Sequence, residues 1–466
     1  MAERKRIYLC LAHMSEDGME QKYVKEAFDT NWVVPLGPNV NGFEKDLEQF
    51  TVQSSESIVR PALEKKRVVA LSSGTAAVHL GLLNCGVKPG DEVIVQSFTF
   101  CASTHPVTYL GATPVLVDSE PDTWNINPEL LEKAILDRKA KTGKYPAAIV
   151  PVALYGMPYK ADRIMEIANK YGIPVVEDAA EGFGSKYKGQ VLGTFGKYGV
   201  LSFNGNKMIT TSGGGALITA NDDEWRKIMM YATQYRESYP YYQHEKIGYN
   251  YRMSNVCAGI GRGQMTVVND HLAHHKHVQK MYEELLKDVP GVHVHSQPEG
   301  HTESAENTEN VPVYDSNYWL CTITIDEDVK VKGQEDAYKT IVTGAVGGAA
   351  GVIHVAESAH TDCEPNANVE AMRVALDKAQ IEARPLWKPM HCQPVYNRGE
   401  RSEEQGAGFV RVTSASSVAY VNGVSEKLFK VGMCLPAGPY VTDDDVRYIV
   451  ENIKANIIGK HSINYR

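Results

Sequence analysis

The stretch that decides the fold is Leu201-Ser-Phe-Asn-Gly-Asn-Lys-Met-Ile-Thr-Thr-Ser-Gly-Gly-Gly215. It begins inside a short apolar run, Gly199–Phe203, and carries one lysine, Lys207, before a glycine triplet. Two earlier segments have the same form, in which an apolar run ends in polar or small residues: Arg67-Val-Val-Ala-Leu-Ser-Ser-Gly-Thr-Ala-Ala77 and Ile173-Pro-Val-Val-Glu-Asp-Ala-Ala180. Each segment predicts a buried strand that ends in a turn.

Further apolar runs without alternation lie between these segments, at Glu92–Val95, Pro114–Val117 and Ala147–Val152. Helical patterns separate the runs, and we expect helices at 75–85, 101–110, 128–136, 159–171 and 221–235. Buried runs that alternate with helices are typical of a mostly parallel sheet covered on both faces. The sequence therefore predicts an α/β fold for this part of the chain.

The pattern changes near residue 290. Residues 255–290 contain few helix breakers and predict one long helix leading out of the first domain. After it, Gly291–His295 and Tyr318–Ile325 alternate as half-buried antiparallel strands do. Near the end, Thr442 precedes three acids and suits the N-cap of a helix. We expect a large domain over 1–290, with its N-terminal segment, and a smaller α+β domain over 291–466.

One glycine-rich stretch, Gly344-Ala-Val-Gly-Gly-Ala-Ala-Gly351, fits neither pattern. It predicts a flexible insertion near 330–366, because the glycine spacing is not that of a nucleotide-binding loop. His354, His360 and Cys363 follow it, at a spacing that matches no strong metal-binding template.

The composition excludes several classes of protein. The formal net charge of −9 gives no overall basic field for nucleic acid or an anionic membrane. The eight cysteines form no Cys-x-x-Cys pair, which argues against a disulfide framework and fits a reducing compartment. No apolar run is long enough to span a bilayer or to form a signal peptide. The sequence predicts a cytoplasmic protein.

Lys207 is the first candidate site residue. No charged residue lies between Leu201 and Asn206, and such surroundings favour the neutral, nucleophilic form of the amine. A surface lysine on a turn is the alternative. The glycines at 213–215 would let the backbone pass close to a ligand.

Asp178 is the second candidate, because it ends a predicted parallel strand at the edge where open α/β sheets bind ligands. A helix N-cap is the alternative role for this residue. Ser73-Gly74-Thr75 joins a strand to a helix, whose N-terminus favours a phosphate, and Ser202 adds a hydroxyl. Phe100 either stacks on a ring or packs into the core. A lysine, a buried acid and a phosphate loop together suit pyridoxal phosphate (PLP).

The chain resembles the DegT/StrS family of PLP-dependent nucleotide-sugar aminotransferases from about residue 8 to 330 and again from about 367. The resemblance rests on these motifs: Ser72–Ala77, Ser97-Phe-Thr-Phe100, Glu177-Asp-Ala-Ala-Glu-Gly182, Gly193-Thr-Phe-Gly196, Ser202–Lys207, Gly248-Tyr-Asn-Tyr-Arg252, Leu36-Gly-Pro38 and Trp387-Lys-Pro-Met-His391. It implies the PLP-dependent transferase fold type I, with a mainly parallel sheet of seven-stranded type and a smaller α+β domain. It also implies a homodimer with shared active sites.

The resemblance also implies roles for single residues. Lys207 matches the Schiff-base lysine and Asp178 the partner of the pyridine nitrogen. Glu181 matches a residue near the cofactor's ring hydroxyl, and Phe100 matches the stacking aromatic. The remaining matches are the phosphate-binding Gly74, Thr75 and Ser202, then Asn250, which reaches the phosphate from the partner subunit, and His391, which borders the sugar nucleotide.

The implied reaction moves the amino group of L-glutamate to the C4 ketone of a nucleotide-linked 4-keto-6-deoxy sugar. A UDP-linked 4-keto N-acetylhexosamine is the expected acceptor, and surface polysaccharide or glycan the expected end product. Relatives that remove a hydroxyl carry histidine in place of the lysine, so Lys207 favours transamination. A PLP-dependent sugar dehydratase and a non-catalytic PLP-binding regulator are the alternatives.

Overall fold

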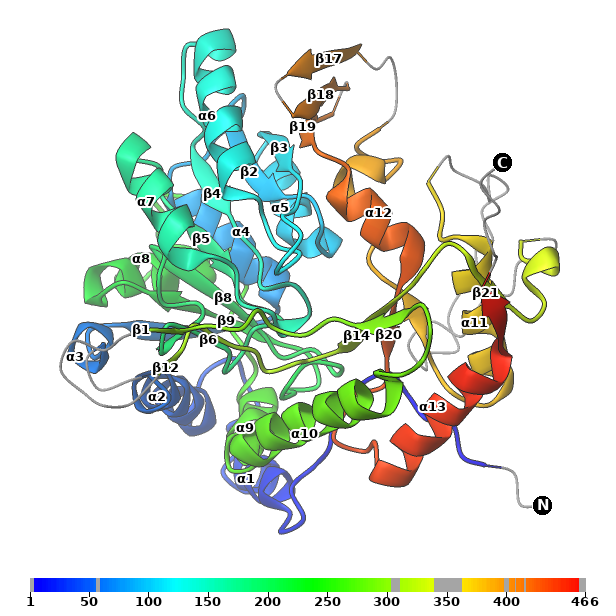
Figure 1. Ribbon diagram of the computed structural model, residues 1–466. Helices are drawn as coiled ribbons and strands as arrows, with labels where there is room; N and C mark the ends of the chain where they lie inside the picture. Colours follow the sequence, from blue (N-terminus) through cyan, green and yellow to red (C-terminus); the bar gives the residue numbers. More distant parts are fainter. Residues whose placement is uncertain are drawn as a thin grey trace.

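The computed structural model describes residues 4–55, 59–302, 311–338, 363–397, 402–406, 408–414 and 416–460 (Figure 1). Part of the expected insertion, residues 339–362 with His354 and His360, lies outside the described residues.

The centre of the molecule is a mainly parallel sheet of seven strands, as the family resemblance implies. Its order is β1 (Arg67–Leu71), β9 (Gly215–Thr219), β8 (Tyr198–Ser202), β5 (Val176–Asp178), β4 (Ala148–Val150), β2 (Glu92–Gln96) and β3 (Thr113–Val117). Bridges at Ile149–Val175 and Val152–Asp178 join β4 to β5, and β9 is antiparallel to both neighbours. The strands are almost wholly buried, which explains their unbroken apolar sequences.

Helices cover both faces of this sheet. One face packs against α4 (Gly74–Asn84), α5 (His105–Tyr109) and α8 (Asp222–Ala232), and the other against α2 (Pro38–Gln53), α6 (Pro128–Thr142) and α7 (Ala161–Tyr171). Most of these helices begin within two residues of the expected positions. The expected helix at 101–110 is the short turn η1 (Cys101–Ser103) followed by α5. The largest difference between an expected and an observed helix end is in α6, which continues to Thr142. It ends there because Gly143 has a φ of 74°, which a helix cannot continue through.

The expected single helix at 255–290 is wrong. The chain forms α9 (Asn255–Met265) and α10 (Val268–Leu286), separated at Val267, whose φ of −116° and ψ of 6° are not helical. The Thr266 hydroxyl donates to the Gly263 carbonyl at 2.6 Å and closes the end of α9. Gly263 also faces α1 (Met19–Asp29), where an added Cβ would lie 2.5 Å from the Glu20 nitrogen. α9 is therefore held against α1, while α10 runs out beside the C-terminal helix (Figure 1).

The C-terminal part is an α+β domain with its own core. The antiparallel sheet has the order β10 (Val292–Val294), β14 (Cys321–Ile325), β20 (Gly432–Leu435) and β16 (Arg384–Pro385). It packs with α10, α11 (Ala367–Lys378) and α13 (Asp443–Asn456), and Ile7 from the N-terminal segment joins this core. Thr442 caps α13 through the Asp445 nitrogen, as its sequence indicates.

One C-terminal segment pairs with the large sheet instead. The strand β19 (Val418–Val421) is parallel to β3, and β18 (Phe409–Thr413) and β17 (Ser402–Gly406) extend it as an antiparallel ribbon. The helix α12 (Val424–Val431) then returns the chain to β20. Residues after 291 thus contribute to both domains.

The remaining elements are short. They are α3 (Arg60–Leu63), β6 (Lys186–Tyr187), β7 (Gln190–Val191), β11 (His301–Thr302), β12 (Val311–Pro312), β13 (Tyr314–Asp315), β15 (Val329–Val331), β21 (Ile457–Lys460), η2 (Leu154–Gly156), η3 (Gln334–Asp336) and η4 (Met390–Cys392).

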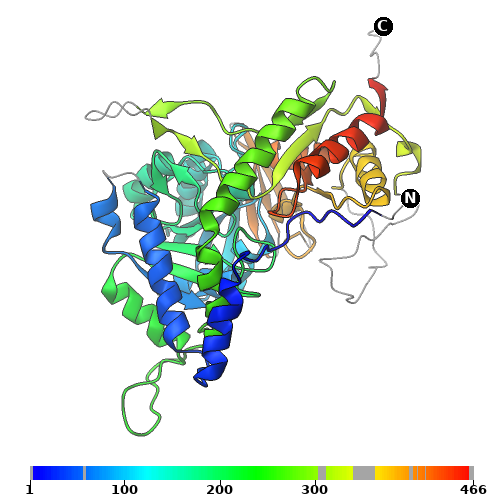
Figure 2. The ribbon, with the colours of Figure 1, turned by 90° about the horizontal axis from the view of Figure 1, so that it is seen from below.

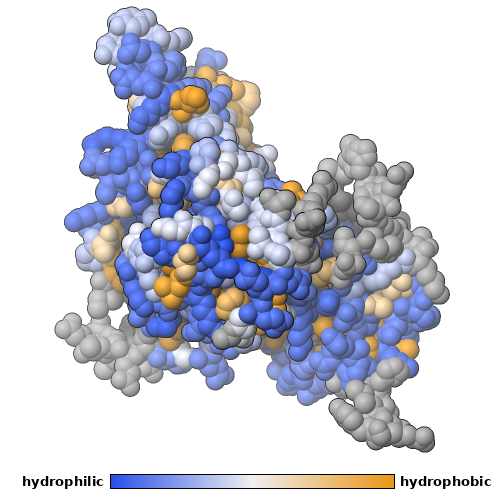
Figure 3. Space-filling model, turned by 90° about the horizontal axis from the view of Figure 1, so that it is seen from above, coloured by the Kyte–Doolittle hydropathy of each residue, from blue (hydrophilic) through white to orange (hydrophobic). Residues whose placement is uncertain are grey.

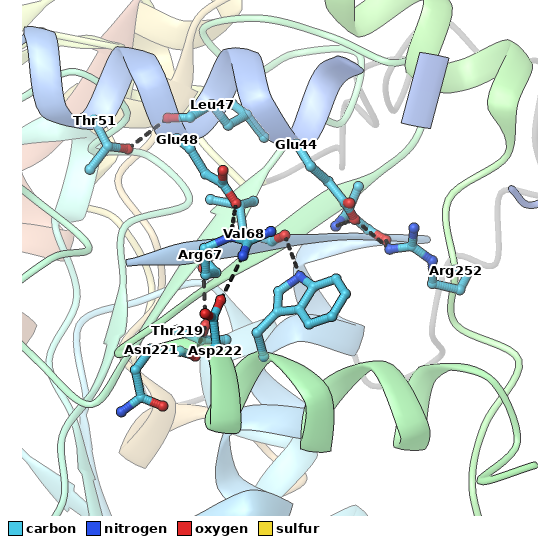
Figure 4. Close-up of polar contacts among 12 residues, drawn as sticks. Glu44, Leu47, Glu48, Thr51, Arg67, Val68, Thr219, Asn221, Asp222 and Arg252 are labelled. Atoms are coloured by element: carbon cyan, nitrogen blue, oxygen red, sulfur yellow. Dashed lines mark hydrogen bonds and ion pairs between the residues drawn. The ribbon is translucent and has the colours of Figure 1, made fainter. Parts of the chain in front are cut away.

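Carboxylates of α2 hold the edge strand β1, as Figure 4 shows. Glu44 accepts from the Ala70 nitrogen at 2.8 Å and from Arg252 at 2.5 Å, and Glu48 accepts from the Val68 nitrogen at 3.0 Å. These side chains satisfy edge N–H groups that would otherwise be unpaired. They fix β1 directly before the Ser72–Thr75 turn.

The surface is mostly hydrophilic on the face drawn in Figure 3, with apolar side chains in small, separate patches. Among the described residues, no helix combines the length and apolar character needed to cross a membrane. Seen from below, the loop between α8 and α9 projects from the body of the molecule (Figure 2).

Candidate active site

A cavity of about 250 Å³ opens where β1, β2, β5 and β8 end. Turns after these strands form most of its wall, because the carboxyl ends of parallel strands meet at one edge of a sheet. Seven of the nine predicted site residues line it: Gly74, Thr75, Phe100, Asp178, Glu181, Ser202 and Lys207.

The first wall is the N-terminus of α4. Ser73 caps this helix by accepting from the Ala76 nitrogen at 3.0 Å. Ser202 lies directly across from Gly74, where an added Cβ would be 3.2 Å from the Ser202 Oγ. Gly215 packs on the other side, and a Cβ there would lie 2.4 Å from the Gly74 nitrogen. The glycines therefore bring a helix N-terminus and a hydroxyl together, an arrangement that favours an anion.

Asp178 lies on the floor of the cavity. Its Oδ2 accepts from the Ser103 hydroxyl at 2.6 Å and its Oδ1 from the Ala180 nitrogen at 3.1 Å. Burial raises the pKa of this carboxyl, and the two hydrogen bonds and the charge of Lys207 oppose that rise. A cation placed against Asp178 would stabilise its charged form.

Glu177, the neighbouring acid, points the other way, because successive side chains of a strand alternate. It is buried and accepts from the backbone nitrogens of Gly193 at 2.9 Å and Gly196 at 2.6 Å. Glu177 therefore holds the Gly193–Gly196 turn and does not reach the cavity.

Lys207 enters the cavity between an acid and an aromatic ring. Its Nζ lies 3.3 Å from Glu181 Oε1 and 4.0 Å from the centre of the Trp319 ring. Glu181 also accepts from the Tyr155 nitrogen at 2.7 Å, and burial raises the pKa of its carboxyl. Tyr155 has a φ of 55°, a strained conformation of the kind found at functional sites.

Phe100 is 55% exposed and lines the cavity mouth near Trp387. The alternative of core packing is wrong for Phe100, and the wholly buried Phe98 takes that role two residues earlier. The ring of Phe100 is free to stack on a flat ligand.

Asn250 and His391 do not line the cavity of their own chain. Asn250 is exposed at the base of the loop between α8 and α9, where it forms a bridge with Thr233. His391 is buried in η4, where Nδ1 pairs with the Ser97 hydroxyl at 2.6 Å and Nε2 with Glu426 at 3.1 Å.

Three contributors to the site were not singled out in the sequence. Trp319 precedes β14 in the C-terminal half, Ser103 lies in η1, and Trp387 lies four residues before His391. Of these three residues, only Trp387 could have been found from the sequence, because it belongs to the Trp387–His391 motif quoted above. Trp319 and Ser103 reach the cavity through tertiary contacts that no local pattern encodes.

These residues fit PLP. The helix N-terminus and Ser202 suit a phosphate. Asp178 accepts its hydrogen bonds from two neutral groups, so its negative charge is available to pair with a positively charged ring nitrogen. The amine of Lys207 lies in the same cavity, where it can meet the cofactor's aldehyde.

Comparisons with known proteins identify the family of this chain. The sequence profile of the DegT/DnrJ/EryC1/StrS aminotransferase family matches residues 14–336. A Bacillus subtilis (strain 168) protein, provisionally named as the pyridoxal phosphate-dependent aminotransferase EpsN, is 38% identical over 96% of this chain and 95% of its own length. GDP-perosamine synthase of Escherichia coli O157:H7 is 30% identical over 96% and 98%.

A solved structure has the same fold. The crystal structure of a DegT DnrJ EryC1 StrS aminotransferase from Brucella abortus superposes with a TM-score of 0.72 at 24% identity, over 94% of this chain and 95% of that one. The predicted fold type I is confirmed. The chain belongs to the DegT/DnrJ/EryC1/StrS aminotransferase family and is a PLP-dependent aminotransferase.

Proposed function

We propose that this enzyme moves the amino group of L-glutamate to the C4 ketone of a nucleotide-linked 4-keto-6-deoxy sugar. The observation that carries the proposal is one cavity that holds Lys207, the buried Asp178 and the N-terminus of α4. The family resemblance supports glutamate as the donor and C4 as the acceptor position.

Each wall of the cavity would contact a different part of PLP. The Gly74 and Thr75 backbone and the Ser202 hydroxyl would bind the phosphate. Asp178, held by the Ser103 hydroxyl, would pair with the ring nitrogen and keep it protonated. Glu181 would approach the ring hydroxyl, and Phe100 would stack on the ring. PLP, when bound, supplies an aldehyde that accepts the amino group and a ring that holds electrons released at the substrate's carbon.

Lys207 moves the protons. Its Nζ takes the proton from the α-carbon of the amino donor, as a general base. In the second half of the reaction the same amine returns a proton to the sugar carbon that receives the nitrogen. Glu181 and Trp319 hold the amine at the cavity wall between these transfers.

Two nucleotides are candidates for the carrier of the acceptor sugar. The family resemblance implies a UDP-linked 4-keto N-acetylhexosamine. A GDP-linked keto sugar is the second candidate, because a relative matched along nearly its whole length is named GDP-perosamine synthase. Both would be consistent with a cytoplasmic enzyme that supplies surface polysaccharide.

A homodimer with shared active sites completes the proposal. Exposed apolar side chains support it: Phe100 at the cavity mouth is 55% exposed, and Tyr242 and Ile247 on the projecting loop are 79% and 86% exposed. We propose that the loop crosses to the partner subunit, where Asn250 reaches the phosphate, and that His391 borders the sugar nucleotide.

The test follows cofactor and product together. The wild type is expected to bind PLP with a yellow colour that L-glutamate bleaches, and then to aminate UDP- or GDP-linked 4-keto sugars. Lys207→Ala should lose the colour change and turnover, whereas Lys188→Ala, an exposed lysine, should keep both.

Three outcomes would contradict the proposal. Loss of a hydroxyl from the sugar would indicate the dehydratase, and PLP binding without turnover on any keto sugar would indicate the regulator. If L-glutamate changed the PLP colour of Lys207→Ala as it does that of the wild type, Lys207 would have no part in the reaction.

A further inference from the structure

Two cysteines and a glutamate from three separate segments meet on the C-terminal side of the molecule. Cys363 precedes α11, Cys392 ends η4, and Glu426 lies in the first turn of α12. Their ligand atoms, two Sγ and a carboxylate oxygen, all lie within 4.8 Å of one another. All three side chains are half-buried, and none of them lines the PLP cavity.

We propose that Cys363, Cys392 and Glu426 form a binding site for a divalent, thiophilic cation of the zinc class. Two sulfur ligands favour such an ion over magnesium or calcium, which take oxygen ligands. Three ligand atoms within 4.8 Å of one another are close enough to share one ion, at which they would take three corners of a tetrahedron. Solvent would take the fourth.

The charges of the site support a cation. The thiols of Cys363 and Cys392 share a hydrogen bond, which lowers the pKa of Cys363 to about 7 and raises that of Cys392, and the charge of Glu426 raises both. Lys388 and Lys430 act in the opposite direction on Cys363. A bound divalent ion would remove the mutual repulsion by neutralising most of the charge of its three ligands.

A second layer of contacts orients the carboxylate. His391 Nε2 pairs with Glu426 Oε1 at 3.1 Å, and His391 Nδ1 pairs with the Ser97 hydroxyl at 2.6 Å. Ligating carboxylates are commonly held by such hydrogen bonds. The ion would therefore tie α11, η4 and α12 together, next to the loop that carries Phe100.

Cobalt(II) titration of the full-length, reduced enzyme tests the site. We expect one equivalent to give the visible ligand-field bands of tetrahedral cobalt, with displacement by zinc(II). Cys363→Ser and Cys392→Ser should abolish these bands. His391→Leu should weaken cobalt binding about 10- to 100-fold by freeing the carboxylate. Cys257→Ser, a half-buried cysteine on α9, is the matched control and should bind as the wild type does.

A second measurement does not depend on the variants' folding. Zinc(II) should protect Cys363 and Cys392 of the wild type from alkylation, with the modified peptides quantified by mass spectrometry. The absence of tetrahedral bands, bands unchanged in both cysteine variants, or equal alkylation with and without zinc would each overturn the proposal. A Cys363–Cys392 disulfide that, once reduced, takes up no cobalt would overturn it too.

Discussion

The Lys207 Nζ lies 4.0 Å from the centre of the Trp319 ring, a contact between the large domain and the segment that leads into β14. The indole Nε1 donates to the Asn206 carbonyl at 2.7 Å, so the ring is anchored to the turn that carries the lysine. The cavity wall is therefore built from both halves of the chain, and the position of the Lys207 amine depends on their packing.

Trp319→Leu should slow the reaction with L-glutamate about 10-fold, because it removes the ring face that holds the amine, a contact of about 1–2 kcal/mol. Trp319→Phe keeps an aromatic face and should restore most of the rate. Stopped-flow absorbance after mixing with glutamate measures both. Equal losses in the two variants would show that the indole hydrogen bond, and not the ring face, matters.

Asp178→Asn should lower kcat about 100- to 1000-fold, because a neutral amide cannot keep the ring nitrogen protonated. The PLP-free protein offers a second readout. Burial raises the folded pKa of Asp178 above its ordinary value of 3.8, so the native state binds more protons and this group costs stability as pH rises above about 3.8.

Urea unfolding of the PLP-free protein should therefore show Asp178→Asn gaining stability relative to wild type between pH 4 and pH 7. Asp17→Asn, at an exposed carboxyl, is the control. A difference between Asp178→Asn and wild type that does not vary with pH would contradict this account.

Gly215→Ala should destabilise the protein by about 1–3 kcal/mol and weaken PLP binding, because the new Cβ would lie 2.4 Å from the Gly74 nitrogen and push the phosphate turn aside. Gly205→Ala is the matched control, since its Cβ would meet no atom within 4 Å. Denaturant unfolding and PLP titration measure the two effects. A Gly215→Ala protein that binds PLP as the wild type does would show that the turn adapts.

The burial of His275 is expected to make the free energy of unfolding fall in acid. It is wholly buried, donates from Nδ1 to the Tyr318 carbonyl at 3.2 Å, and burial lowers its pKa from 6.5 to about 3. As the pH falls, His275 takes up a proton in the unfolded chain before it does so in the folded protein. The stability that this histidine contributes is therefore complete above about pH 6.5 and is lost as the pH falls toward 3.

His275→Asn should therefore flatten the loss of unfolding free energy between pH 6.5 and pH 4, whatever its effect at pH 7. His277→Asn, on the exposed side of α10, is the comparison variant for any general effect of removing a histidine from this helix. Urea unfolding at a series of pH values gives both slopes. Parallel curves for wild type and His275→Asn would rule out this histidine as the cause.

Sequence alone determined six strands of the central sheet and the cavity at their ends, for a simple physical reason. The candidates Gly74, Asp178 and Lys207 each follow an apolar run, and the carboxyl ends of parallel strands meet at one edge. Order along the chain was enough to predict that they share a cavity. The capped start of α13 was equally local, since Thr442 and Asp445 are three residues apart.

Tertiary structure decided the rest, because those features join residues far apart in the chain. Trp319 reaches Lys207 from more than a hundred positions away, and β19 extends a sheet whose neighbouring strand, β3, lies some three hundred residues earlier. Gly263 packs closely against α1 just before the break between α9 and α10, and Phe98 is buried whereas Phe100 is exposed. Local patterns report periodicity and chemistry, whereas long-range packing selects which side chains finally touch.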